Sequence, residues 1–280
     1  MIVDCHTHIF PDYIKNSREE YFHNEQAFKL LYSSPAAKIS GVDELMESMD
    51  SHGVSTSMVF GFPWKSGETA RRNNDYIMDA VSRFPDRLKG FACFDMEWQD
   101  APMEVERCIR GGLCGVGELA FYLSGIDGDA LLRLEPVMDI CLKAGNLPVM
   151  IHTNESVGHT YPGKTPNTVE QIYELARTFP DNLILLAHWG GGIFFYYLLK
   201  KDAKDVLKNI WYDTAASPFL YDPAIYRVVR EVGLIDKVLF GSDYPLLGPG
   251  RYFKDMNESG ISIEDKRKIQ GENAQLLFSL

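Results

Sequence analysis

The sequence predicts an α/β protein whose strands and helices form a (β/α)8 TIM barrel. Short apolar runs alternate with longer amphipathic segments eight times along the 280 residues, a length at which such barrels are common. The rival is a doubly wound open sheet, but no GxGxxG motif follows the first apolar run. The sequence also shows no boundary between domains. We therefore expect one barrel domain over residues 1–280.

The eight short runs have the composition of strands that are buried on both faces, because they are dense in β-branched and other apolar residues. In chain order they are IVDCHTH (2–8), TSMVFGF (56–62), LKGFACFD (88–95), CGVGELAF (114–121), LPVMIHT (147–153), LILLAHWG (183–190), IWYDTAAS (210–217) and KVLFGSDYP (237–245).

The segments between these runs carry helical periodicity, and most of them end at glycine, asparagine or proline, the usual helix stop signals. The expected helices span residues 42–53, 75–85, 103–112, 131–145, 168–180, 197–209, 223–233 and 263–278.

Two connections are longer than the rest, residues 9–41 after the first strand and 244–262 after the eighth. Both leave the C-terminal ends of strands, where a barrel builds its active site. We expect these segments to act as lids or walls of the site, with plain surface loops as the alternative.

Composition excludes several classes of partner. The formal net charge of -11 argues against a nucleic acid or an anionic membrane as the main partner and leaves a small-molecule substrate. No apolar stretch approaches the ~20 residues of a membrane span, and the N-terminus lacks a signal-peptide pattern, so a cytoplasmic protein is expected. The five cysteines are odd in number and lack CxxC spacing, which favours reduced core thiols.

Histidines and carboxylates of metal-ligand type fall near the C-terminal ends of the expected strands. Six are candidate metal ligands: His6, His8, Glu118, His152, His188 and Asp243. Strand ends on this side of a barrel converge on one concavity. Four imidazoles and two carboxylates there must be paired, hydrogen-bonded or metal-bound. The set suits zinc first, with manganese or iron as alternatives, and a metal-free polar cluster is the competing interpretation.

Taken together, DCHTH, the histidines of the fifth and sixth strands and SDYP resemble the amidohydrolase superfamily. The closest resemblance is to its amidohydrolase-2 branch of metal-dependent hydrolases and decarboxylases, and it extends to the closing GENAQLLF. It implies a barrel of the metal-dependent hydrolase type. It further implies that a first metal is ligated by His6, His8, His152 and Asp243. His188 would orient water or substrate, or ligate a second metal, and Asp243 in hydrolytic members accepts a proton from the metal-bound water.

Glu118 departs from the pattern of many two-metal members, which place a carboxylated lysine on the fourth strand. The stretch GVGELAFY instead resembles GExGLDY of the TatD-type nucleases, in which the glutamate bridges two metals. Two interpretations stay open: Glu118 bridges a second metal, or it holds a ligand histidine through a hydrogen bond.

Candidates for substrate binding follow the strand ends. The loop NESVGHTYPGK (154–164) carries His159, Tyr161 and Lys164, and mixes hydrogen-bond donors with turn residues. Trp64, Trp189 and Tyr122 follow other strand ends and are weaker candidates for lining the pocket, since an aromatic residue there is equally often packing.

Three functions compete. The preferred one is a hydrolase that directs metal-activated water at a small ester, lactone, amide or phosphoester. The second is a metal-dependent non-oxidative decarboxylase of a small aromatic or enoic acid, and the third is a catalytically silent metal-binding barrel. The aromatic run FFYYLL (194–199) is interpreted first as core packing and second as a subunit interface, which would give a homodimer.

Overall fold

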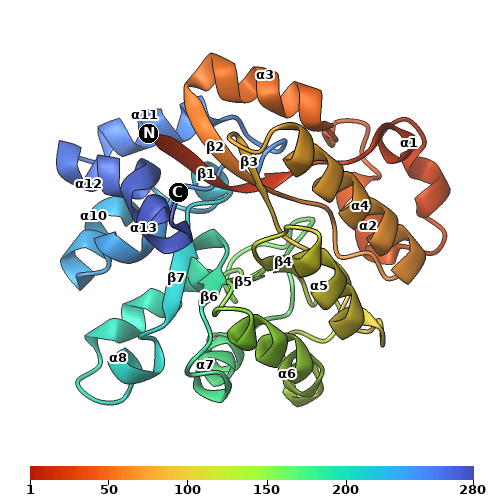
Figure 1. Ribbon diagram of the computed structural model, residues 1–280. Helices are drawn as coiled ribbons and strands as arrows, with labels where there is room; N and C mark the ends of the chain where they lie inside the picture. Colours follow the sequence, from red (N-terminus) through yellow and green to blue (C-terminus); the bar gives the residue numbers. More distant parts are fainter.

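The computed structural model describes residues 1–280 and contains eight strands that alternate with helices (Figure 1). Every strand pair is parallel. The strands are β1 (Ile2–His8), β2 (Val54–Phe60), β3 (Leu88–Gly90), β4 (Val116–Leu119), β5 (Val149–Ile151), β6 (Ile184–Leu186), β7 (Ile210–Asp213) and β8 (Val238–Leu239).

The strands close into a barrel through two seams. Strands β1–β3 form one sheet in sequence order and β4–β8 form another. A parallel bridge between Ala92 and Val116 joins β3 to β4. A bridge between Thr7 and Tyr244, with a 2.8 Å hydrogen bond from the Cys5 amide to the Phe240 carbonyl, joins the β8 segment to β1. The expected (β/α)8 barrel is confirmed, and the open sheet is excluded.

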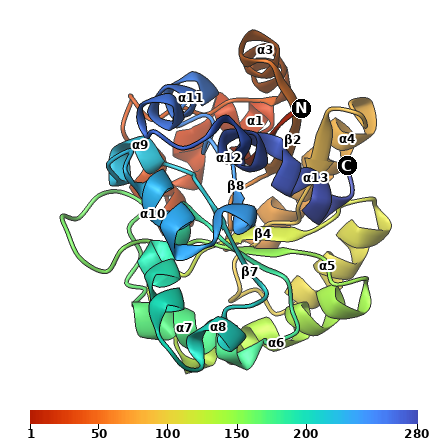
Figure 2. The same cartoon turned by 90° about the vertical axis from the view of Figure 1, so that its left-hand side faces the viewer.

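The helices form the outer layer around the strands (Figures 1 and 2). The helices along the chain are α1 (Asp12–Lys15), η1 (Arg18–Tyr21), α2 (Gln26–Tyr32), α3 (Val42–His52), α4 (Gly67–Arg83), α5 (Ala101–Arg110), α6 (Gly128–Lys143), α7 (Val169–Thr178), η2 (His188–Leu198), α8 (Ala203–Val206), α9 (Ser217–Leu220), α10 (Ile225–Val232), η3 (Ile235–Lys237), α11 (Pro249–Glu258), α12 (Ile263–Arg267), η4 (Lys268–Glu272) and α13 (Asn273–Phe278).

The expected helix over residues 197–209 is wrong. The chain winds as the 3-10 segment η2 up to Leu198, and only Ala203–Val206 are α-helical afterwards. Asp202 has a φ of 65°, a left-handed conformation that an α-helix does not contain. Most strands are also shorter than expected, because the residues at their C-terminal ends leave the ladder to build the site.

Two apolar clusters stabilise the barrel. The larger one contains 58 buried residues and lies mostly between strands and helices. A smaller one of 10 residues fills the inside of the barrel with side chains from several strands, among them Met58, Phe91, Met150 and Leu185, and it includes Ala274 of α13. The five cysteines are free, and four of them are fully buried.

The two long connections have regular structure of their own. Residues 9–41 contain α1, η1 and α2, and residues 244–262 contain α11. The Lys38 ammonium of the first segment donates to the Leu246 carbonyl of the second at 3.4 Å, so the two meet beside the barrel mouth. That they move as lids stays a prediction.

The aromatic run 194–199 is only partly core. Phe194 is buried, whereas Phe195, Tyr196, Leu198 and Leu199 are exposed, so core packing explains only part of the run. The homodimer stays a prediction. No helix is both long enough and apolar enough to span a bilayer.

Candidate metal centre

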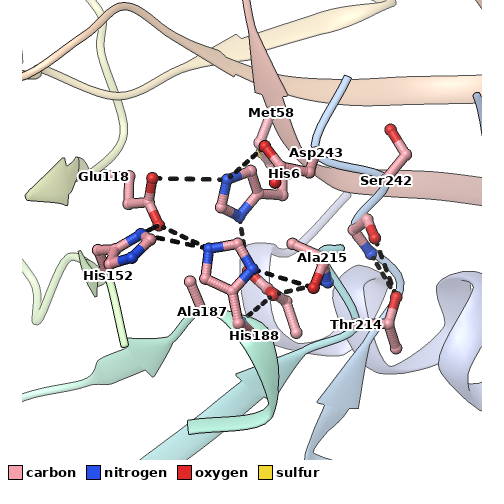
Figure 3. A network of polar contacts seen from close by, with 12 residues as sticks. His6, Met58, Glu118, His152, Ala187, His188, Thr214, Ala215, Ser242 and Asp243 are labelled. Carbon is pink, nitrogen blue, oxygen red and sulfur yellow. Dashed lines mark hydrogen bonds and ion pairs between the residues drawn. The ribbon is translucent and has the colours of Figure 1, made fainter. Parts of the chain in front are cut away.

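The six candidate ligands meet at the C-terminal mouth of the barrel. Their ligand atoms form three overlapping groups in which all atoms lie within 4.8 Å of one another: His6 with His8 and Glu118, His6 with His188 and Asp243, and Glu118 with His152 and His188. Figure 3 shows Glu118 and the imidazoles of His6, His152 and His188 turned toward one another.

His6 and His8 are held so that their Nε2 atoms face the same point. His6 Nδ1 donates to Asp213 Oδ2 at 2.9 Å, and His8 Nδ1 donates to the Gly61 carbonyl at 2.8 Å. These bonds place a proton on each Nδ1 and direct the two Nε2 atoms, which lie 3.2 Å apart, toward the same point. A register shift of β1 between Asp4 and Thr7 accompanies this arrangement, and such irregularities often re-aim side chains beside active sites.

His188 begins the AHWGGG turn that follows β6. Its Nδ1 donates to the Ala215 carbonyl at 3.0 Å, and its Nε2 lies 3.4 Å from Glu118 Oε1 and 3.3 Å from His152 Nδ1. All residues from His188 to Gly192 have positive φ. At Gly191 the turn passes so close to the segment after β5 that a Cβ atom would lie 2.4 Å from the Asn154 carbonyl oxygen. Glycine is required there for two reasons, its backbone conformation and its size.

Glu118 connects the histidines across the centre. Its Oε1 accepts a 2.9 Å hydrogen bond from His152 Nδ1, and its Oε2 lies 3.7 Å from the Nε2 atoms of both His6 and His8. Burial raises the pKa of Glu118, but the charges of His152 and His6 and the hydrogen bonds outweigh burial and hold that pKa well below its usual range. The carboxylate is therefore ionised.

Asp243 is held against the start of the chain. Its amide donates to the His6 carbonyl at 3.0 Å, and its Oδ1 lies 3.5 Å from His8 Nε2. Asp4 connects β1 to the segment after β8, because its Oδ1 accepts hydrogen bonds from the amides of Ser242 at 2.9 Å and His6 at 3.2 Å. The Asp243 side chain is 15% exposed, the most of the ligand candidates, and it faces the pocket.

The donor set fits a divalent cation. Burial lowers the pKa of His6, yet the charges of Asp213, Glu118 and Asp243 outweigh burial and raise it to about 10. The pKa of His188 rises to about 9 in the same way, against burial, through Glu118 and Asp243. In addition, the buried His152 Nε2 has no hydrogen-bond partner. The carboxylates thus favour positive charge at this centre, and a divalent metal of the zinc, manganese or iron type could take the place of these protons on the nitrogen and oxygen ligands.

A cavity of about 570 Å³ opens over these ligands. Its walls are largely apolar and aromatic, with Tyr32 and Leu31 from the 9–41 segment, Phe62, Tyr122, Phe219 and Leu220, and Pro245 and Leu246 from the 244–262 segment. Apart from the ligand histidines, its basic residues are Lys38 and His159. The cavity therefore suits a small, largely apolar molecule that reaches the metal centre through a polar group.

The structure separates the candidates for substrate binding. His159, Tyr161 and Tyr122 line the cavity. Trp64 and Trp189 do not, because both are fully buried and their Nε1 groups donate to Asn73 Oδ1 and Ser217 Oγ.

The Lys164 ammonium is not in the cavity lining either, since it turns back to the carbonyls of Val157 and His159 at 2.6 and 3.3 Å. The expectation that Trp64, Trp189 and Lys164 lie in the cavity is therefore corrected. These residues support the framework and its loop instead.

Two residues of the site were missed in the sequence. Asp213 is fully buried and accepts from His6 Nδ1 through Oδ2 and from the His188 amide through Oδ1, at 2.9 Å each. An acidic residue at the end of the seventh expected strand was the available signal. Tyr32 lies in the long 9–41 connection, where no strand end marks it.

Comparison with known proteins identifies relatives along most of the chain. The sequence model of the amidohydrolase family Amidohydro_2 matches residues 3–280. A gamma-resorcylate decarboxylase of Polaromonas sp. is 24% identical over 290 residues, covering 85% of this chain and 87% of that protein. A 2-amino-3-carboxymuconate-6-semialdehyde decarboxylase of Dictyostelium discoideum is 24% identical over 333 residues, covering 97% and 90%.

Solved structures share the fold. The 5-carboxyvanillate decarboxylase of Novosphingobium aromaticivorans, solved with manganese and 4-hydroxy-3-methoxy-5-nitrobenzoic acid, superposes with a TM-score of 0.75 at 16% identity, covering 100% of this chain and 96% of that one. These relatives overturn the preferred expectation of a hydrolase, because they are decarboxylases, the second of the competing functions. The metal in that neighbour is manganese, not the zinc that was expected first.

Proposed function

The chain belongs to the amidohydrolase family, and from that premise we propose that it is a divalent-metal-dependent decarboxylase of a small aromatic carboxylic acid. One observation supports this proposal above all. A cluster of side chains suited to bind a cation lies at the bottom of an aromatic cavity of about 570 Å³. An aromatic acid would match both parts, with its carboxylate at the cluster and its ring between the apolar walls.

We assign the metal to His6, His8, His152 and Asp243, with His188 and Glu118 completing the cluster. Nitrogen and carboxylate donors of this kind suit manganese as well as zinc, and manganese is favoured here because a structural neighbour of this fold contains it. When bound, the metal would supply a positive charge that binds the substrate carboxylate and offsets negative charge developing in the reaction.

The residues of the chain then account for the remaining steps. Phe62 and Tyr122 have nearly parallel rings, at 16°, and form a wall against which a planar ring can lie. The reaction replaces the carboxylate by a proton on the same ring carbon and releases carbon dioxide, so a proton donor is needed and no water is consumed. Asp243 faces the cavity and is partly exposed, so it can take a proton from solvent and pass it to that carbon.

This use of Asp243 is the reverse of its role in a hydrolase, where it would accept a proton from water. Glu118 stays ionised. Its hydrogen bond with His152 and the hydrogen bond of Asp213 with His6 keep the histidine nitrogens aimed at the centre. Loss of carbon dioxide without an oxidant therefore requires only binding, charge stabilisation and one proton transfer.

The test is a product assay of the Mn²⁺-loaded protein with a panel of hydroxy- and methoxybenzoic acids. We expect carbon dioxide release with stoichiometric formation of the decarboxylated ring. In ²H₂O, one deuterium should enter the product at the carbon that lost the carboxylate. Asp243→Asn should abolish turnover, whereas Asp205→Asn, an exposed carboxylate of α8, should leave it unchanged.

Three results would contradict the proposal. The first is incorporation of ¹⁸O from labelled water into an ester, lactone, amide or phosphoester product without carbon dioxide release, which would indicate hydrolysis. The second is full activity after complete removal of the metal. The third is tight Mn²⁺ binding with no turnover of any acid in the panel, which would favour a silent metal-binding barrel.

A further inference from the structure

The hydrogen-bond ladder between β2 and β3 breaks off beside the metal centre. Near its end, the Phe91 amide donates to the Val59 carbonyl at 3.0 Å. Rungs of a parallel ladder advance by two residues on each strand, so the next rung would join the Cys93 amide to the Gly61 carbonyl. Both of these groups bond to side chains instead.

The Gly61 carbonyl holds a candidate metal ligand. It accepts from His8 Nδ1 at 2.8 Å, the bond that aims His8 Nε2 at the centre of the site. Glycine is required at this position, because a Cβ atom would lie 2.3 Å from Asn73 Oδ1. A carbonyl that would ordinarily belong to the sheet is thus used to orient an imidazole.

Asn74 supplies the acceptor that the Cys93 amide would otherwise find on β2. The Cys93 amide donates to Asn74 Oδ1 at 3.0 Å. Asn74 is fully buried and lies in the interior of α4, although asparagine is a poor helix former. A buried amide without an acceptor is costly, so the side chain of Asn74 compensates for the rung that the sheet lacks.

A buried carboxylate fixes the orientation of the Asn74 side chain. Asn74 Nδ2 donates to Glu104 Oε1 at 3.0 Å, and Glu104 also accepts from Arg107 at 2.7 and 2.8 Å. An ionised carboxylate can only accept hydrogen bonds, and the Cys93 amide can only donate. The amide group of Asn74 therefore has one possible orientation, with its NH₂ toward Glu104 and its oxygen toward Cys93.

Cys93 extends the effect of Asn74 to a second ligand candidate. The Cys93 thiol donates to the Glu118 carbonyl at 3.1 Å. The carboxylate of Glu118 accepts from His152 Nδ1 at 2.9 Å. A thiol is a weak donor, so its direction depends on how its own backbone is held, and Asn74 holds that backbone. Asn74 thus influences His8 of β1 and Glu118 of β4, although it contacts neither.

We propose that Asn74 is a positioning residue of the metal centre. It takes the place of the Gly61 carbonyl as acceptor for the Cys93 amide. That carbonyl then stays available to His8, and the Cys93 thiol stays directed at Glu118. Without the Asn74 side chain, the Cys93 amide competes with His8 for the Gly61 carbonyl. The inference rests on the metal ligands assigned under the proposed function, but not on the reaction.

The test compares Asn74→Leu with Asn182→Leu, because leucine has nearly the size of asparagine but makes no hydrogen bond. Asn182 is the matched control. It is also buried and donates to the Met138 carbonyl at 2.8 Å, but it precedes β6 and so lies at the other end of the barrel. Calorimetric titration of the metal-free proteins should show Mn²⁺ affinity about tenfold or more weaker in Asn74→Leu and unchanged in Asn182→Leu.

A second readout separates positioning from a general loss of stability. The His8 Nδ1 proton is observed by NMR in metal-free, ¹⁵N-histidine-labelled protein, and its signal is assigned by its absence in His8→Gln. In Asn74→Leu this signal should shift and exchange faster with solvent, because its acceptor is shared with the Cys93 amide. In wild type and in Asn182→Leu it should be the same.

Asn74→Ala replaces Asn74→Leu if the leucine variant does not fold. A folded Asn74 variant in which either the Mn²⁺ affinity or the His8 signal is unchanged overturns the inference, as does an equal change in Asn182→Leu. Failure of the proposed reaction gives a different result. A protein that releases no carbon dioxide, but whose Mn²⁺ affinity and His8 signal depend on Asn74, would retain the positioning role and lose the assigned chemistry.

Discussion

Asp213 and His6 are 207 residues apart in sequence and in contact at the centre of the site, with Oδ2 of the aspartate accepting from Nδ1 of the histidine at 2.9 Å. The same carboxylate accepts from the His188 amide through Oδ1 at 2.9 Å. Asp213 therefore sets the tautomer of one candidate ligand and the position of another. Outer partners of this kind tune both the orientation and the basicity of metal-bound histidines.

Replacing Asp213 by asparagine should weaken metal binding. The amide keeps the size of the side chain but loses the charge that favours the Nδ1 proton of His6, so Mn²⁺ affinity should fall about 10- to 100-fold. Calorimetric titration of the metal-free variant measures this. Asp205→Asn on the exposed α8 is the control. Mn²⁺ affinity within about twofold of wild type would show that Asp213 has no positioning role.

Removal of the metal should lower the stability of the fold. The cluster brings two carboxylates and four histidines together, and a cation that binds only the folded state stabilises it by mass action. At a Mn²⁺ concentration about 100 times its dissociation constant, the free energy of unfolding should increase by about 2.7 kcal/mol. Thermal unfolding of chelator-treated protein with increasing Mn²⁺ measures the effect. Titration with Mg²⁺ to the same concentration controls for ionic strength, and a melting temperature independent of Mn²⁺ would contradict a site at this cluster.

The AHWGGG turn offers a paired test of why glycine occupies two neighbouring positions. Gly191 and Gly192 both have left-handed φ, at +58° and +88°. A Cβ at Gly191 would meet the Asn154 carbonyl at 2.4 Å, whereas nothing lies within 4 Å of a Cβ at Gly192. Gly192→Ala should therefore cost only the backbone strain, about 1–2 kcal/mol.

Gly191→Ala should cost this strain and, in addition, push the turn that carries His188 away from Asn154. Urea unfolding compares the two variants, and Mn²⁺ titration should show weaker binding only for Gly191→Ala. Equal stabilities and equal affinities would mean that the close approach to Asn154 does not position the site.

The fold and the ligand positions were predictable from sequence because both depend on local patterns. Eight buried strands show as apolar runs, and a ligand at a strand end is visible as a polar residue that closes such a run, as with His152 in PVMIHT. Barrel geometry alone then brings the ends of the strands together around one concavity. This is why His6 and Asp243, at opposite ends of the chain, were placed together.

The contacts of these residues were not predictable in the same way. The bond between His6 and Asp213 and the entry of Tyr32 into the cavity depend on long-range packing that leaves no periodic signal. The aromatic residues Trp64 and Trp189 show the opposite error, since proximity to a strand end does not decide whether a side chain points into the cavity or into the core. The hydrolase expectation failed for a chemical reason, because the same ligand set serves water activation and decarboxylation.

Glu104 should make a buried ionic contribution to stability that disappears in acid. Its carboxylate is fully buried and accepts from Arg107 at 2.7 and 2.8 Å, from Asn74 at 3.0 Å and from Arg71 at 3.3 Å. Burial raises the pKa of Glu104, but the hydrogen bonds from Arg107 and Asn74 and the charge of Arg107 outweigh it and leave the pKa lowered. Asn74 in turn accepts from the Cys93 amide at 3.0 Å, which ties the network to the end of β3.

Glu104→Gln should reduce the free energy of unfolding by about 3 kcal/mol near neutral pH, because it leaves the guanidinium groups without a buried counter-charge. A carboxylate whose pKa is lower in the folded than in the unfolded protein stabilises the fold above the unfolded value of about 4.3, and this stabilisation is lost as the pH falls through the lower folded value. The difference in the free energy of unfolding between wild type and variant should therefore be largest near neutral pH and shrink below about pH 4.

Urea unfolding over this pH range measures the difference. Glu106→Gln is the control, since Glu106 makes an exposed 3.5 Å pair with Arg110 worth less than about 0.5 kcal/mol. A Glu104→Gln effect as small as that of Glu106→Gln, or one that grows in acid, would exclude an ionised Glu104 as a stabilising element.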